Sequence, residues 1–154
     1  MTSTTAQQVR QRIEAICATI PGITTVLDGT EPDITDALLP AVRVLTRAAE
    51  RSAESRQKML VTRTYRILLY VRLIPRHENQ LYDQQPDVDA AEAWLDIIPD
   101  FFYKNAPRLE LDKTSLDGVW STGPMSADEP AIAQWALNTY TVIPHDFTVL
   151  TQRA

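Results

Sequence analysis

The chain has 154 residues, with 15 Lys and Arg against 20 Asp and Glu, and a formal net charge of −5. This length fits one domain spanning residues 1–154, and 44% hydrophobic residues can supply a sizeable core. The acidic balance argues against a general nucleic-acid-binding protein. No apolar run approaches the roughly 18–20 residues of a membrane span, and residues 1–8 lack a secretory signal pattern. With Cys17 as its single cysteine, we expect a soluble protein made in a reducing compartment.

The N-terminal part of the chain predicts a helix followed by a strand. Apolar residues recur every three or four positions from Thr5 to Ile20, which is typical of one face of a helix. Pro21 and Gly22 end this pattern. The β-branched run from Ile23 to Leu27 predicts a short strand, and Glu31 to Leu39 has no regular pattern.

Two long strands are predicted between residues 41 and 74. Ala41 to Ala49 is compatible with a strand, the polar stretch from Glu50 to Gln57 predicts a loop, and Lys58 to Ile74 carries the strongest β pattern in the chain. Arg63 interrupts the apolar alternation of this last strand, from which we infer that its N-terminal part leaves the core. Segment 41–74 is therefore expected to form a long, protruding β-hairpin.

The C-terminal half predicts a second helix and the rest of a sheet. The helix should begin near Asp87 or Asp89 and reach Tyr103, with Pro99 kinking or dividing it. Further strands are predicted at Val119–Ser121, Ala133–Ile143 and Phe147–Leu150, with a turn at Pro144–Asp146. The fold class is therefore α+β, with two helices packed on one face of a mainly antiparallel sheet.

The sequence contains no pattern typical of an active site. Its four glycines lie in predicted turns, so no glycine-rich phosphate loop is present, and nucleophile elbows are absent too. His77 and His145 each follow a predicted strand-ending proline and are expected to be solvated, whereas Cys17 is expected to be a buried thiol. The acidic group at 83–89 fits helix capping better than a calcium loop. We predict no catalytic, cofactor-binding or metal-binding residues.

The predicted hairpin is strongly basic. Nine of the fifteen Lys and Arg residues fall within positions 43–76, against two Glu. Such charges can be a solvated strand surface that prevents edge-to-edge aggregation, or an arm that contacts a partner's carboxylates or DNA phosphates. The candidate contact residues are Arg43, Arg47, Arg51, Arg56, Lys58, Arg63, Arg66 and Arg72.

The second predicted helix carries an acidic stripe. Like charges at three- and four-residue steps share one face and repel by a few tenths of a kcal/mol per pair. The stripe can be a solvated face or a docking surface for the basic hairpin of a neighbouring copy, which would be a head-to-tail contact. Its residues are Asp89, Glu92, Asp96 and Asp100.

The order of these elements resembles one protein family. The segments that carry the resemblance are IPGITTVLDG (Ile20–Gly29), LPAVRVLTR (Leu39–Arg47), TYRILLYVRLI (Thr64–Ile74) and DIIPDFF (Asp96–Phe102). Together with two closing strands, they are similar to the tail terminator proteins, also called tail completion or tail-to-head joining proteins, of long-tailed bacteriophages. The resemblance covers most of the chain as a pattern of elements, without an invariant motif.

This resemblance implies a structural, non-enzymatic virion protein, assembled in the host cytoplasm. Such proteins form a ring, typically of six copies, at the head-proximal end of the tail tube. The ring stops tube polymerisation, joins the tail to a head-completion or connector protein and lets double-stranded DNA pass through its channel. It also implies an α+β subunit with helices on one side of its sheet. The basic hairpin departs from the family, since tail channels are commonly acidic.

Three other functions remain open from the sequence. A head-completion (stopper) protein or a minor tail protein would also assemble as a ring, but at another position in the phage neck. A small enzyme or binding domain would need a deep pocket with converging carboxylates, lined by Trp94, Trp120 or Trp135. A monomeric regulatory domain would bind DNA through the hairpin with strong salt dependence.

Overall fold

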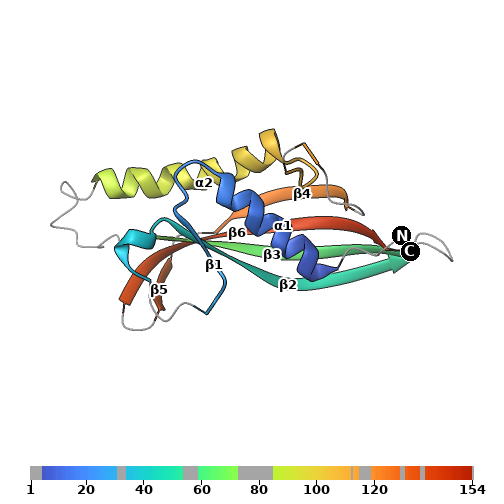
Figure 1. Cartoon of the computed structure of the whole chain (residues 1–154), viewed down its shortest axis with the longest axis horizontal. Coiled ribbons are helices and arrows are strands. Elements are labelled where there is room, and N and C mark those ends of the chain that lie inside the picture. The colour runs from blue at the N-terminus through green and yellow to red at the C-terminus, as the bar shows by residue number, and fades with distance from the viewer. Residues whose placement is uncertain are drawn as a thin grey trace.

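A computed structural model describes residues 5–30, 34–53, 59–72, 85–111, 113–114, 119–128, 131–135 and 138–153. Within these ranges, two α-helices, one 3-10 helix and six strands form an α+β fold with a mostly antiparallel sheet (Figure 1). In chain order they are α1 (Ala6–Thr19), β1 (Thr25–Leu27), η1 (Asp36–Leu38), β2 (Ala41–Ala53), β3 (Met59–Val71), α2 (Gln85–Asn105), β4 (Val119–Ala127), β5 (Ala131–Trp135) and β6 (Asn138–Arg153). Neither described helix is long and apolar enough to cross a membrane.

Helix α1 confirms the first predicted helix. It starts in a capping box, in which the Thr5 side chain accepts a hydrogen bond from the Gln8 N–H while the Gln8 side chain accepts one from the Thr5 N–H. Its apolar positions, among them Val9 and Ile13, are buried. The helix ends before Pro21, and Gly22 adopts a φ of 95°, which favours glycine.

Helix α2 begins slightly earlier than predicted and is not divided. Pro86 lies in its first turn, where a missing N–H needs no partner. The helix continues through Pro99 to Asn105. Trp94, Ile98 and Phe102 are buried at the spacing that the sequence predicts.

The sheet has the strand order β1-β2-β3-β6-β4, and β5 also pairs with β6. Strand β1 is parallel to β2, and every other pairing is antiparallel. The segment predicted as a single strand at Ala133–Ile143 is divided between β5 and β6, which pair from Ala131 opposite Val142 to Trp135 opposite Asn138. Alternation of side chains alone does not reveal such a hairpin.

Strand β6 also runs through the turn that was predicted at Pro144–Asp146, so that prediction is wrong. At this point β6 changes neighbour on one side, from β5 to β4. The Asp128 N–H donates to the Pro144 carbonyl at 2.9 Å, on the β4 side. Because the N–H and C=O of one strand residue point to the same side, the missing N–H of Pro144 faces this junction and removes no bond to β3.

Strands β2 and β3 pair with each other from Ala41 opposite Tyr70 to Ala53 opposite Met59. The protrusion of this hairpin is not confirmed, because β3 also pairs with β6 along its whole length, from Met59 opposite Arg153 to Val71 opposite Thr141. The inference that the strand leaves the core at Arg63 is wrong. Val61 is 0% exposed and Arg63 is 5% exposed.

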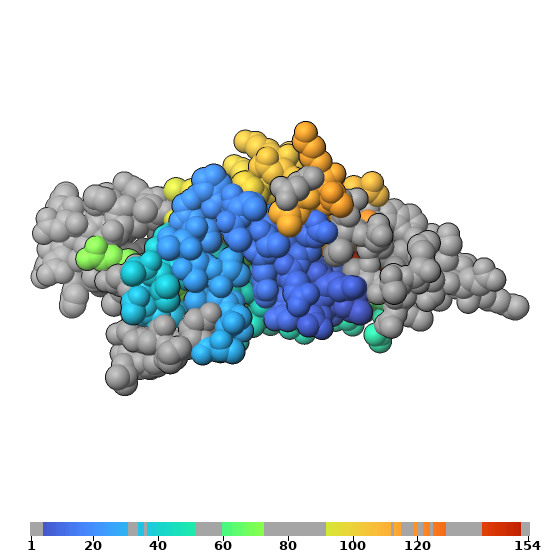
Figure 2. Space-filling view, in the orientation of Figure 1, coloured from blue at the N-terminus to red at the C-terminus, as the bar shows by residue number. Residues whose placement is uncertain are grey.

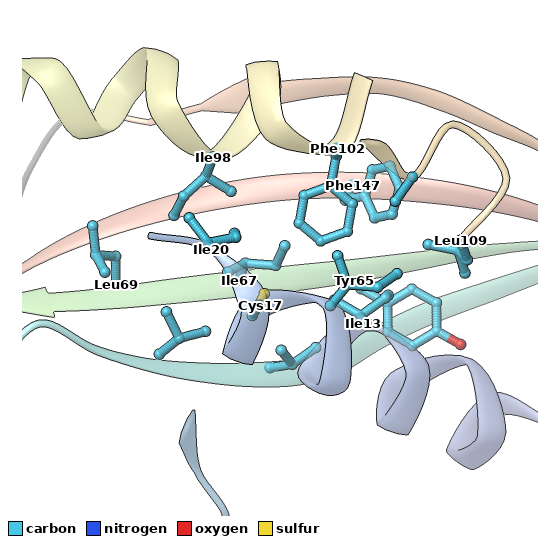
Figure 3. Close-up of a cluster of buried hydrophobic side chains, with 14 of the residues drawn as sticks. Ile13, Cys17, Ile20, Tyr65, Ile67, Leu69, Ile98, Phe102, Leu109 and Phe147 are labelled. Carbon is cyan, nitrogen blue, oxygen red and sulfur yellow. The ribbon is translucent and has the colours of Figure 1, made fainter. Parts of the chain in front are cut away.

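Both helices pack on the same face of the sheet, as predicted. One cluster joins Ile13 and Cys17 of α1, Ile98 and Phe102 of α2, and Tyr65 of β3 (Figure 3). Its other members include Ile67, Leu69 and Phe147, and the rings of Phe102 and Phe147 lie 5.3 Å apart. In Figures 1 and 2, α1 crosses the near side of the sheet, with the end of α2 above it.

A second, smaller cluster lies on the opposite face of the sheet. Tyr70 and Val142 belong to it, and they alternate along their strands with Leu69 and Ile143 of the main core. Leu27, Ile34, Ala41 and Tyr140 complete this cluster. The opposite face is thus apolar near the start of β2.

Candidate interaction surfaces

The predicted basic surface does not form one continuous patch. Because side chains alternate along a strand, its arginines lie on two faces of the sheet. Several of these arginines form contacts with other groups of the same subunit. Arg63 is buried on the helix side, whereas Arg66 lies on the opposite face. Arg56 and Lys58 have side chains outside the described residues.

Arg66 is held by two aspartates on the face of the sheet opposite the helices. Its Nε and Nη2 atoms donate to Asp146 at 2.8 and 3.0 Å, and Nη2 also donates to Asp128 at 3.2 Å. The Arg47 Nη1 atom lies 3.7 Å from Asp146. The hydrogen bonds from Arg66 lower the pKa of Asp146 below its usual value. This group, named the Arg66 cluster, neutralises two of the predicted contact residues.

Arg63 lies beside Tyr65 within the sheet. Burial raises the pKa of Tyr65 to about 12, and the positive charge of Arg63 opposes this shift. The Tyr65 hydroxyl donates to the Ala6 carbonyl at 3.1 Å and so fixes the start of α1 to the sheet. An arginine that is 5% exposed cannot offer its charge to a partner.

Arg43 is half-buried next to Gly29 and Tyr70. A Cβ atom on Gly29 would lie 3.1 Å from Arg43 Nη2, so glycine leaves room for the guanidinium. Burial raises the pKa of Tyr70, while Arg43, through its charge and a side-chain hydrogen bond, lowers it. Arg43 therefore contributes to the packing of this corner of the sheet.

Arg51 and Arg72 are the candidate arginines that remain exposed with no ion pair in the described part of the chain. Arg51 lies in β2 opposite Val61, and Arg72 directly follows β3. Beyond Arg43, no described strand pairs with the outer edge of β2, and Thr46 to Arg51 are all exposed. We call the segment from Thr46 to Arg51 the free β2 edge.

The acidic stripe lies on the solvent side of α2. Glu92, Asp96 and Asp100 are exposed, as is Lys104 in the last turn. The side chain of Asp89 falls outside the described residues. Two apolar side chains are also exposed on this helix, Ile97 at 37% and Tyr103 at 82%. The sequence predicted the acids but not the exposed tyrosine, because its spacing continues the apolar pattern.

A hollow of about 500 Å³ lies between the end of α2 and β4. It is lined mainly by apolar groups and carries one carboxylate, Asp100. Its lining includes Asp100, Phe102, Tyr103, Thr122, Met125 and Phe147. Trp94 packs in the core and does not line this hollow, and the side chains of Trp120 and Trp135 are outside the described residues. We call this hollow between α2 and β4 the α2–β4 groove.

Two reactive side chains in the described part of the chain, those of His145 and Cys17, are buried. His145 is 0% exposed, so the prediction of a solvated turn residue is wrong, because β6 continues through this position. Burial lowers the pKa of His145, which favours the neutral ring. Cys17 is a buried free thiol, as predicted, and burial raises its pKa. His77 is outside the described residues. Over the ranges that the structure describes, no three His, Cys, Asp or Glu side chains could together hold a metal ion.

The sequence matches no family model, and no curated protein matches it.

Proposed function

We propose that this protein is a tail terminator: a structural subunit that forms a ring at the head-proximal end of a bacteriophage tail tube. In this role the ring stops tube growth, offers the joining surface for a head-completion protein and surrounds a channel for double-stranded DNA. The support from the sequence is the order of elements that resembles this family. The α+β subunit with both helices on one face of its sheet is compatible with it.

One observation carries the ring part of the proposal: exposed charges of opposite sign lie on different elements. The acids Glu92, Asp96 and Asp100 are on α2, whereas Arg51 is on the free β2 edge. A surface and its complement at two places on one subunit favour head-to-tail contacts, which close into a ring when the rotation permits. The Arg66 cluster is internally neutralised and is not needed for this contact.

The experiment is native mass spectrometry with negative-stain imaging over a series of protein concentrations, at low and at moderate salt. We expect a closed ring with a central hole wide enough for duplex DNA. Screening of exposed charges should weaken the ring at higher salt. A protein that stays monomeric at every concentration, or forms only open chains, contradicts the proposal.

A further inference from the structure

The α2–β4 groove combines three features that together suit an arginine. Asp100 supplies a carboxylate, and Tyr103, three residues on, presents a ring that is 82% exposed. Phe102, Met125 and Phe147 supply an apolar lining. A guanidinium can pair with a carboxylate while its plane stacks on an aromatic ring, which a lysine ammonium does less well. The groove is therefore chemically suited to an arginine side chain.

The free β2 edge carries an exposed arginine, Arg51, and a small side chain, Ala49, close to it. Ala49 and Arg51 lie opposite Arg63 and Val61, so both face the helix side of the sheet. The alanine offers little bulk beside the arginine, which lets the strand approach another surface closely. The backbone groups on this side of β2 have no described strand as a partner beyond Arg43.

From this complementarity we infer that the α2–β4 groove of one copy is the docking site for Arg51 on the free β2 edge of a second copy. This inference rests on the proposed ring and assigns its subunit contact. Arg51 pairs with Asp100 and stacks on Tyr103, while Ala49 lies against the apolar lining. Each copy uses its groove on one side and its β2 edge on the other.

Reciprocal charge reversal tests this contact. Asp100→Arg and Arg51→Glu both change exposed side chains, so each variant should fold, which circular dichroism and thermal unfolding check. In either variant alone, like charges face each other, and we expect association at least about tenfold weaker by sedimentation velocity. In an equimolar mixture, every groove can face an oppositely charged edge again when the two variants alternate. Assembly should therefore return, with only even numbers of subunits.

Three further variants give matched comparisons. Tyr103→Phe keeps the aromatic ring and should assemble like the wild type, whereas Tyr103→Ala should weaken association. Arg72→Glu reverses another exposed arginine that lies outside the free β2 edge, and should leave assembly unchanged.

The outcomes separate this inference from the proposed function. Rings that persist in Asp100→Arg and Arg51→Glu overturn the groove contact and leave the ring proposal standing. If assembly is weakened in each variant and returns on mixing, but the complexes never show a central hole, the result supports the contact and contradicts the ring. Assembly that is lost in each variant and does not return on mixing overturns the pairing of Arg51 with Asp100.

Discussion

The arginines of this chain show how a side chain's role depends on what its neighbours supply. Arg66, Arg63 and Arg51 look alike in the sequence as members of one basic run. In the fold, Arg66 is neutralised by Asp146 and Asp128, Arg63 is buried beside Tyr65, and Arg51 stays exposed. Only Arg51 among these three is available to a partner without rearrangement of the subunit.

The Arg66 cluster predicts a loss of stability when its central cation is removed. Arg66→Met keeps most of the side-chain stem but removes the hydrogen bonds to both aspartates. Because these groups are about a quarter to a half exposed, we expect the free energy of unfolding to fall by about 1–2 kcal/mol. Urea denaturation measures the change. Arg72→Met is the control and should be neutral, and an equal loss in both variants would contradict a specific role for the cluster.

His145 predicts a dependence of stability on pH. Burial holds its pKa below the usual 6.5, so the unfolded state binds the proton more readily than the native state. The stabilisation is fully present above pH 6.5 and decreases as the pH falls toward the lowered pKa. The slope from this group is at most about 1.4 kcal/mol per pH unit.

The matched comparison is His145→Leu, which cannot take up a proton. The unfolding free energy of the wild type relative to that of the variant, measured by urea denaturation between pH 5 and 8, should decrease as the pH falls below 6.5. A difference that stays constant over this range would show that His145 does not titrate on unfolding.

At the scale of elements, β3 is a central strand in place of the expected free arm. Its distal part is paired on both sides, and Val61 there is buried. Val61→Ala should lower the free energy of unfolding by about 1–2 kcal/mol, because it removes buried methyl groups. Thr62→Ala, on the less buried opposite face, should cost clearly less in the same urea titration. Equal small effects at both positions would favour a solvated arm.

Both helices and most strands could be predicted from periodicity alone, because each buries one face. The continuation of β6 through Pro144 could not, since proline usually ends a strand and only the change of neighbour there makes it harmless. The neutralisation of Arg66 could not be predicted from the sequence either, because its partners Asp128 and Asp146 lie more than 60 residues away along the chain. Of the candidate sites, the acidic positions on α2 were predictable, and the α2–β4 groove beside them was not.

At the scale of the whole molecule, arginines that lie close together in the sequence are separated onto different faces of the sheet. The ion pairs on the face of the sheet opposite the helices neutralise Arg47 and Arg66. The acids of α2 remain exposed, so assembly of the proposed ring would depend on Arg51 at the free β2 edge.

The pairing of β3 with β6 has a consequence for the time course of folding. The two strands meet through residues as far apart in the chain as Met59 and Arg153, and β6 also pairs with β4 and β5. A nascent chain that has left the ribosome only as far as β5 still lacks the second neighbour of β3. The entropy cost of closing such long loops comes before the strand contacts that offset it can form. Native pairing at the centre of the sheet is therefore a late and comparatively slow event. Until then, an edge rich in β-branched and aromatic residues is available for aggregation.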